Sequence, residues 1–255
     1  MNPDTWLFDL GNTRLKYAPL RNDGMLVNSM LGEVGAIAHD GAHLPEGWDA
    51  ALPPRFEAAV LTMVGAQALR TQLLETLTAR CGRLSIARTV AQLDGLRIAY
   101  PIPAHLGTDR FLAMLGARRR GPGPWLVVGI GTAITLDLLD ADGLHHGGRI
   151  APSPALMREA LHGRAAQLPE HGGAFVAFAD DTLDALRSGC DGAALALVEQ
   201  GLRDAEARIG RRPTLLLHGG GVDALDGLDP AAIRAPHLVL EGLAAWTLGP
   251  TGTRP

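Results

Sequence analysis

A tight turn near the amino terminus carries the first residues that could do chemistry. It reads Asp9-Leu10-Gly11-Asn12-Thr13-Arg14-Leu15-Lys16, directly after a short apolar stretch. Backbone N–H groups at such a bend can hold phosphate oxygens, and glycine lets the backbone approach an anion closely. Asp9 can hold Mg²⁺ directly or through water, and Asn12 and Thr13 can donate hydrogen bonds to phosphate. The pattern predicts a phosphate site, with an ordinary β-turn and a solvated aspartate as the alternative.

Lys16 stands out because the 23 Lys and Arg residues of the chain comprise this one lysine and 22 arginines (23 − 1). A compact ammonium and a planar guanidinium are not interchangeable at a site that binds a concentrated negative charge. The retained lysine therefore favours a role in neutralising the charge of a β- or γ-phosphate. Chance retention of a single lysine is the alternative.

A second glycine turn follows in the middle of the chain, within the run Gly129-Ile130-Gly131-Thr132-Ala133-Ile134-Thr135-Leu136-Asp137. Gly131 and Thr132 can supply another set of hydrogen-bond donors to an anion. Phosphoryl transfer needs mainly positioning, a metal and charge stabilisation. Two such turns facing the same nucleotide would supply most of these requirements.

Predicted strands flank both turns, and the two clusters are similar. Apolar patterning predicts strands over 6–10, 15–20 and 25–30, then over 125–128 and 132–139, with a return strand ending at 147–148. The glycine turns are offset by 120 residues (129 − 9), and the hairpin turns Asp23-Gly24 and Asp142-Gly143 by 119 (142 − 23). This weak internal repeat predicts two similar α/β halves that present their turns to a shared cleft. Two unrelated hairpins are the alternative.

The rest of the chain alternates helical and extended patterns. The spacing predicts helices over 66–80, 106–119, 152–166, 180–187, 192–209 and from Glu241, strands over 58–63, 214–217 and 237–240, and a loop over 32–55.

The composition narrows the class of protein. Of 255 residues, 47% are hydrophobic and 20% charged, which is atypical of a disordered chain. The net charge of −4 argues against nucleic acid as the main partner. We expect a cytoplasmic protein with no membrane partner, because no stretch of about 18 apolar residues or signal-like amino terminus is present. The two separated cysteines, Cys81 and Cys190, fit a reducing compartment.

The sequence resembles the type III pantothenate kinases, members of the acetate kinase, sugar kinase, Hsp70 and actin superfamily. Four blocks carry the resemblance: Asp9 to Lys16; Tyr100-Pro101-Ile102-Pro103-Ala104-His105-Leu106-Gly107-Thr108-Asp109-Arg110; Gly131 to Asp137 with Gly147 to Pro152; and Asp181-Thr182, Ser188-Gly189, Gly219-Gly220 and Leu238 to Leu243. The second and third blocks are the most specific. The resemblance implies an α/β fold of duplicated ribonuclease H-like (actin-like ATPase) halves, 1–120 and 121–255, with a cleft between them.

The resemblance also implies an activity and a role for each matched residue. The activity would be ATP-dependent phosphorylation of pantothenate to 4'-phosphopantothenate, the first step of coenzyme A biosynthesis, in a homodimer. Asp109 would accept the proton of the pantothenate hydroxyl. The pantothenate pocket would comprise Tyr100, Gly107, Thr108, Asp109 and Arg110, with Thr182 of the partner subunit. ATP would contact Asp9, Leu10, Gly11, Asn12, Thr13, Arg14, Leu15, Lys16, Gly131 and Thr132, with Mg²⁺ at Asp9.

Four positions depart from the family pattern: Gly129 replaces an Asp, Ser153 a Gly, Asp181 an Asn, and His218 a Thr. In the family the Asp at the first of these positions binds a monovalent cation, K⁺ or ammonium. Glycine has no side chain that could bind it. We therefore expect an active kinase whose K⁺ dependence is altered or absent.

Two alternatives stay open at this point. The chain could be another kinase of the superfamily that acts on a sugar or a short acid, although the segment around Tyr100 and Asp109 favours pantothenate. It could also be a catalytically impaired accessory or regulatory protein, as some family members are labelled. Gly129 favours that second alternative, whereas the intact Asp9, Lys16 and Asp109 argue against it.

Overall fold

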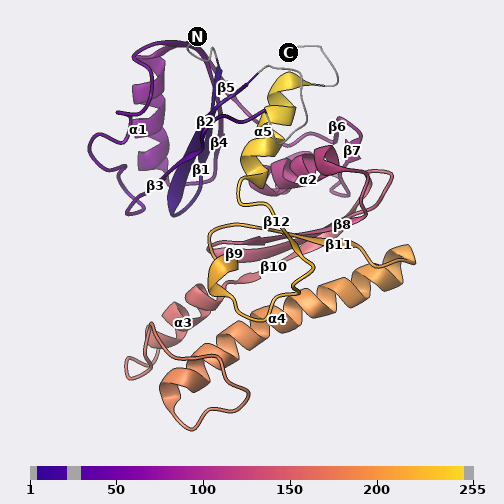
Figure 1. Cartoon of the computed structure of the whole chain (residues 1–255). Helices are drawn as coiled ribbons and strands as arrows, with labels where there is room; N and C mark the ends of the chain where they lie inside the picture. The colour runs from indigo at the N-terminus through magenta and orange to yellow at the C-terminus, as the bar shows by residue number, and fades with distance from the viewer. Residues whose placement is uncertain (1–4, 22–29, 250–255) are drawn as a thin grey trace. The chain divides into compact units, whose positions relative to one another are not determined.

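The structure, a computed structural model, describes residues 5–21 and 30–249, which form two compact units (Figure 1). Unit 1 comprises the described residues up to Pro122, residues 142–144 and residues 237–249. Unit 2 comprises residues 123–141 and 145–236. Unit 2 therefore begins after Pro122, and residues 237–249 belong to unit 1. The division of the chain into halves 1–120 and 121–255 stays a prediction.

A five-stranded sheet in the order β3-β2-β1-β4-β5 forms the centre of unit 1. Its strands are β1 (Thr5–Leu10), β2 (Arg14–Pro19), β3 (Gly35–Ala38), β4 (Phe56–Met63) and β5 (Cys81–Ile86). Neighbours among the first three strands are antiparallel, whereas β4 and β5 run parallel to β1. Unit 1 also contains α1 (Gln67–Thr78), β6 (Gln92–Leu93), β7 (Leu96–Arg97), the 3₁₀ turn η2 (Pro103–His105), α2 (Thr108–Arg120) and α5 (Leu238–Leu248).

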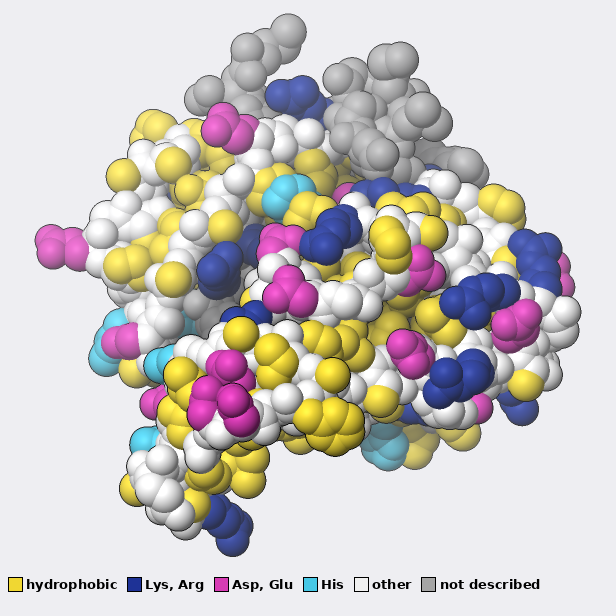
Figure 2. Space-filling model, turned by 60° about the horizontal axis from the view of Figure 1, so that its bottom comes forward, with side chains coloured by type: hydrophobic (Ala, Val, Ile, Leu, Met, Phe, Trp, Pro, Cys, Tyr) yellow, Lys and Arg dark blue, Asp and Glu magenta, His cyan; other side chains and the backbone are white. Residues whose placement is uncertain are grey.

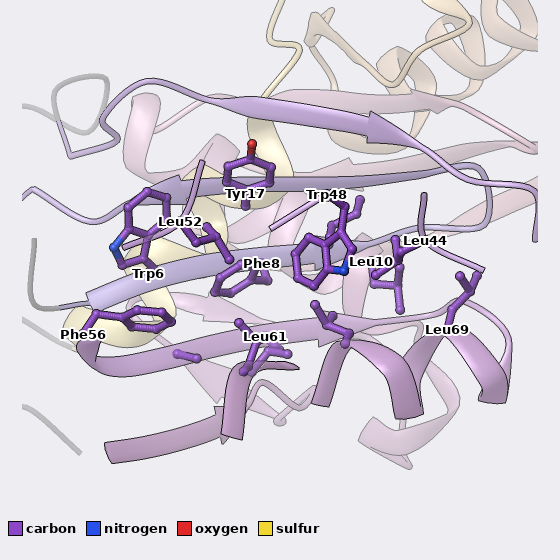
Figure 3. Close-up of a cluster of buried hydrophobic side chains, with 14 residues drawn as sticks. Trp6, Phe8, Leu10, Tyr17, Leu44, Trp48, Leu52, Phe56, Leu61 and Leu69 are labelled. Carbon is purple, nitrogen blue, oxygen red and sulfur yellow. The ribbon is translucent and has the colours of Figure 1, made fainter. Parts of the chain in front are cut away.

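One face of this sheet packs against α1 (Figure 3). Leu69, Leu73 and Leu77 recur every fourth residue of α1, so they share one side of the helix. They pack with aromatic side chains of the strands, including Phe8, and with Trp48 from the segment before β4. Removing these side chains from water supplies the main stabilisation of the sheet that carries the first glycine turn.

The other face of the sheet contacts α5, which packs in turn against α2. The two helices approach closely at glycines: a Cβ on Gly242 would lie 1.8 Å from Leu112 O, and one on Gly116 would lie 2.6 Å from Leu238 O. The predicted strand over 237–240 is therefore wrong, because Leu238 begins α5. A short apolar run does not by itself distinguish a strand from a buried helix.

Unit 2 contains a second five-stranded sheet, in the order β10-β9-β8-β11-β12. Its elements are β8 (Trp125–Ile130), β9 (Ala133–Leu139), β10 (His145–Pro152), α3 (Pro154–His162), α4 (Thr182–Ile209), β11 (Thr214–His218), the 3₁₀ turn η3 (Val222–Ala224) and β12 (Ile233–Arg234). The strand order and directions repeat those of unit 1. This repetition confirms the predicted duplication of ribonuclease H-like halves, whereas the cleft between them stays a prediction.

The strand predicted over 25–30, apart from Met30, and the turn Asp23-Gly24 lie outside the described residues. Two further predictions differ from the structure. The third strand of the sheet is β3, within the segment expected to be a loop. The helices predicted over 180–187 and 192–209 are one helix, α4. Ser188 does not interrupt it, because its hydroxyl accepts a hydrogen bond from Val176 N–H, 2.9 Å away, in the preceding loop.

The charge distribution of the surface and the length and hydrophobicity of the helices indicate which kinds of partner the protein could bind. On the face shown in Figure 2, basic and acidic side chains are interspersed, with hydrophobic side chains between them. Within residues 5–21 and 30–249, no helix is both long and apolar enough to span a membrane.

Candidate active site

The first glycine turn joins β1 to β2 and is closed by a hydrogen bond from Gly11 N–H to Arg14 O, 3.0 Å long. Leu10 and Leu15 on either side are fully buried in the core, so only their backbone groups could serve a ligand. Residues 12–14 of the bend are exposed. The core therefore holds the two strands while the turn presents its polar groups to solvent.

His39, which follows β3, supports this turn, and the sequence analysis did not identify it. Its Nδ1 accepts a hydrogen bond from Gly41 N–H at 3.2 Å, so the ring proton resides on Nε2. Nε2 then donates to Gly11 O at 3.1 Å. His39 N–H also donates to Thr13 O at 3.2 Å. A histidine within a predicted loop gives no sequence signal for such a role.

Asp9 lies in a row of three polar residues across the sheet. It is opposite Lys16 of β2 and Thr62 of β4, so the three side chains share one face. The Thr62 hydroxyl is buried and has no hydrogen-bond partner. Burial raises the pKa of Asp9 to about 7; the Lys16 ammonium opposes this rise, and the Asp109 carboxylate adds to it. The fold thus brings Asp109 near Asp9 although 100 residues separate them (109 − 9).

The ammonium of Lys16 acts on more than one neighbour. Burial lowers the pKa of His237, at the start of α5, and the Lys16 charge lowers it further, while Glu241 opposes the shift. Lys16 is half-buried. Its positive charge therefore acts both on the carboxylate of Asp9 and on His237 at the amino-terminal end of α5.

Asp109 lies in the first turn of α2, where the helix dipole favours a negative charge. The residue before the helix, Gly107, is in close contact with it. A Cβ on Gly107 would lie 2.7 Å from Asp109 Oδ1, so a larger residue at position 107 would displace this carboxylate. Gly107 therefore has a steric role in positioning Asp109, which the family motif did not reveal.

Arg110 follows on α2 and is held by Tyr100. Its Nη1 donates to Tyr100 Oη at 3.3 Å, and its Cζ lies 6.0 Å from the centre of the tyrosine ring, within the range of a cation–π contact. Arg110 is buried, with 6% of its surface exposed, whereas Tyr100 and Thr108 are half-buried. The predicted substrate residues of unit 1 therefore lie together on α2 and the segment before it.

The residues around Asp9 fit a Mg²⁺ ion that is shared with phosphate. Within the described parts of the chain, no group of three or more His, Cys, Asp or Glu side chains could hold a metal. Mg²⁺ is commonly held by one or two carboxylates together with substrate phosphates and water. Asp9 and Asp109 are two such carboxylates, and a cation would offset the burial of Asp9. The unpartnered hydroxyl of Thr62 beside Asp9 also fits a hydrated ion.

The second glycine turn lies at the end of β8, where Gly131 N–H donates to Ala133 O at 2.9 Å. A further glycine turn follows β11, and its Gly221 N–H donates to Ile130 O at 3.0 Å. Gly219 has a φ of +98°, and a Cβ there would lie 2.2 Å from Ile130 O. Both turns therefore lie at one edge of the unit 2 sheet. Their convergence with the turn of unit 1 stays a prediction.

Ser153 and Asp181, two of the four residues that differ from the family pattern, are the N-cap residues of α3 and α4. Ser153 Oγ accepts from Leu156 N–H at 3.2 Å at the start of α3. Asp181 Oδ1 accepts from Asp184 N–H at 2.9 Å at the start of α4. Both residue types are favoured at this position, so the local fold explains them. Thr182 is the first residue of α4 and is exposed.

Comparisons with known proteins identify the family of this chain. The family described as type III pantothenate kinase matches residues 6–204. The type III pantothenate kinase of Stenotrophomonas maltophilia (strain K279a) is 50% identical over 95% of this chain and 97% of its own length. That of Xanthomonas axonopodis pv. citri (strain 306) is 51% identical over 94% and 96%.

Solved structures share the fold at low identity. A Baf family protein from Campylobacter jejuni has a TM-score of 0.60 and 20% identity, covering 93% of this chain and 94% of that one. The activator of 2-hydroxyisocaproyl-CoA dehydratase from Clostridium difficile, solved with bound ADPNP, has a TM-score of 0.51 and 12% identity, covering 94% and 92%. With the sequence matches over nearly the whole length, the chain belongs to the type III pantothenate kinase family.

Proposed function

We propose that this protein transfers the γ-phosphate of ATP to pantothenate, forming 4'-phosphopantothenate and ADP in the first step of coenzyme A biosynthesis. The observation that carries the proposal is the placement of Asp9 directly opposite Lys16 beside the first glycine turn of unit 1, with Asp109 close enough to raise the pKa of Asp9. Membership of the family supplies the identity of the acceptor. We place the reaction in the cytoplasm, where both ATP and the later steps would be available.

The residues of unit 1 divide the reaction between them. Backbone N–H groups of the first glycine turn bind phosphate oxygens, and Lys16 neutralises their charge. Bound at Asp9, Mg²⁺ supplies charge neutralisation for the phosphates. The pantothenate hydroxyl oxygen forms a bond to the γ-phosphorus, the bond to the bridging oxygen of ADP breaks, and the hydroxyl proton passes to Asp109. The Arg110 guanidinium binds the carboxylate of pantothenate.

A coupled assay of ADP release with ATP, Mg²⁺ and pantothenate tests the proposal directly. Release that depends on pantothenate and yields a phosphorylated product supports it. Turnover only with a sugar or another hydroxy acid would point to a different kinase of the superfamily. Nucleotide binding with no turnover on any acceptor would favour the accessory protein instead.

The hydrogen bond from His39 to Gly11 should contribute to nucleotide binding. We expect His39→Leu to raise the KM for ATP by about 3- to 10-fold, because one partly buried hydrogen bond contributes about 1 kcal/mol. His39→Gln can place an N–H near Gly11 O and should restore most of the affinity. The KM for pantothenate should stay unchanged. Steady-state kinetics would measure these constants, with His43→Leu, at an exposed neighbouring histidine, as the control. Equal KM values for ATP in His39→Leu, His39→Gln and His43→Leu would contradict a specific role of the hydrogen bond to Gly11.

A homodimer in which Thr182 of the partner subunit contacts pantothenate is part of the proposal. Large exposed hydrophobic side chains occur on both sides of this residue in the sequence: Ile150, Leu161, Phe175, Phe178 and Leu183. Phe178 is fully exposed, at 101%. We infer that these side chains take part in the contact with a second copy, since a contiguous hydrophobic patch marks such a site.

Replacing Phe178 by serine is expected to weaken this dimer about tenfold or more, because an exposed aromatic side chain at an interface is a common hot spot. Sedimentation velocity across a dilution series would measure the dissociation constant. Ile233→Ser, which alters another exposed hydrophobic residue of unit 2, is the control. A wild-type chain that stays monomeric at all concentrations would contradict the dimer and the role of Thr182.

We also propose that the kinase works without K⁺ or ammonium. Residue 129, an Asp in the family, is a buried glycine at the end of β8. It offers no carboxylate to a monovalent cation. Mg²⁺ and ATP remain the expected cofactors.

A further inference from the structure

The second glycine turn stands next to a row of three residues that crosses the unit 2 sheet. Gly129 of β8 is opposite His218 of the parallel strand β11 and opposite Thr135 of the antiparallel strand β9. Directly opposed residues on neighbouring strands point to the same face. Val128 and Ile130, the chain neighbours of Gly129, point to the other face and pack in the core with α4. The row therefore lies on the face away from α4.

The imidazole of His218 occupies the space that a side chain at residue 129 would need. A Cβ built on Gly129 would lie 2.8 Å from His218 Nε2, 2.9 Å from His218 Cε1 and 2.8 Å from Thr135 Oγ1. Contacts this short between non-bonded heavy atoms are repulsive. An aspartate at 129 and this position of the imidazole exclude each other. The absence of a side chain at 129 and the position of the His218 ring are therefore structurally linked.

His218 lies where both glycine turns of unit 2 begin. The parallel strands β8 and β11 end at the same edge of the sheet, and they lead into residues 131–132 and 219–221. Gly131, Thr132 and Gly220 are exposed, whereas His218 is half-buried. It is the only basic residue within 129–135 and 218–222. An imidazole can donate N–H groups and carry a positive charge near neutral pH.

The same row does not fit a monovalent cation. K⁺ is held by several oxygen atoms that replace its hydration shell. Residue 129 contributes no side-chain oxygen, and the histidine ring fills the space beside it. An imidazolium or a neutral N–H donor at this position instead favours an anion at the adjacent turns.

We propose that His218 takes the place of the monovalent cation in this chain, supplying from the protein the positive charge and the hydrogen-bond donor that stabilise ATP at the second glycine turn. The inference rests on the proposed kinase function. It deepens that function by naming the residue that makes K⁺ dispensable. It also predicts that the double variant Gly129→Asp/His218→Thr depends on K⁺ for activity.

The test compares wild type with His218→Thr, His218→Gln and the double variant Gly129→Asp/His218→Thr in sodium and in potassium buffers. Wild type should have equal kcat and KM for ATP in both salts, within about twofold. His218→Thr should raise the KM for ATP about tenfold in both salts, since a charge-assisted contact is lost. His218→Gln should recover part of the affinity in both. The double variant should be weak in sodium and recover about tenfold in potassium.

A readout without turnover keeps this inference separate from the kinase assignment. The rise in Tm caused by Mg²⁺ and a non-hydrolysable ATP analogue should follow the same pattern across variants and salts. His146→Thr, which removes a 2.7 Å contact with Asp140 on the same sheet, is the control and should show no salt effect.

Several results would overturn the inference. Strong K⁺ activation of wild type would do so, as would His218→Thr with unchanged ATP affinity, or a double variant that responds to neither salt. Should the double variant fail to fold, the KM values for ATP of His218→Thr and His218→Gln decide whether His218 contributes to ATP binding. If wild type does not phosphorylate pantothenate, the kinase proposal fails, and the Tm shifts with the analogue still decide whether His218 serves the nucleotide.

Discussion

Asp109→Asn is expected to lower kcat for pantothenate phosphorylation by about 10²- to 10⁴-fold, the range typical of a lost general base. The amide keeps the size and one acceptor oxygen of the carboxylate, but it cannot take the hydroxyl proton. An aspartate is a weak base and acts mainly by orienting the hydroxyl as charge develops, so we expect the KM for ATP to change by less than about threefold. Single-turnover kinetics with radiolabelled ATP would separate the chemical step from product release.

Two observations would discriminate this role from a structural one. Glu75→Gln, an exposed carboxylate on α1, should leave kcat unchanged. Removing the Asp109 charge should also lower the pKa of Asp9, since that charge adds to its rise. An Asp109→Asn enzyme with wild-type kcat would rule out Asp109 as the proton acceptor and leave Arg110 as the main substrate contact on α2.

Asp9→Asn is expected to abolish at least about 99% of the turnover with Mg²⁺-ATP and at the same time to stabilise the fold at alkaline pH. The loss of turnover follows from the loss of the carboxylate that holds Mg²⁺. The gain in stability follows from burial, which raises the pKa of Asp9 to about 7. Active-site groups commonly have this opposition between stability and activity.

The pH dependence of this gain has a definite sign. Because the folded pKa lies above the unfolded value of 3.8, the folded state binds more protons between the two values, and stability falls as pH rises through this window. Above about pH 7 the wild type bears the whole penalty, whereas below about pH 4 both states are protonated and it bears none.

Denaturant unfolding in the absence of Mg²⁺ would measure this effect. We expect Asp9→Asn to have a free energy of unfolding higher by about 1–3 kcal/mol at pH 8 and equal to wild type near pH 4. A variant less stable than wild type at pH 8 would mean that the attraction between Asp9 and Lys16 outweighs the burial of the carboxylate. Added Mg²⁺ should stabilise wild type only.

Predictions from local pattern were confirmed where local chemistry decides structure. The strand that ends near Asp9, the turn at Gly11 and the helix that begins near Asp109 follow from apolar spacing and turn residues. The strand over 237–240 was wrong because a short apolar run does not distinguish a strand from a buried helix, and Leu238 begins α5, which packs against α2. The strand β3 within the segment 32–55, which the sequence predicts to be a loop, was missed. This strand is short and is stabilised by its pairing with β2, which no local pattern of residues indicates.

By itself, the sequence determined which chemistry is available to this protein: two glycine turns, one lysine, the carboxylates at Asp9 and Asp109, and a repeated strand pattern. Only the tertiary structure decided which groups act on one another. The shift of the Asp9 pKa and the exclusion between His218 and residue 129 depend on distances between residues far apart in the chain. Electrostatic and steric energies change steeply with distance, and no local pattern of residues specifies those distances.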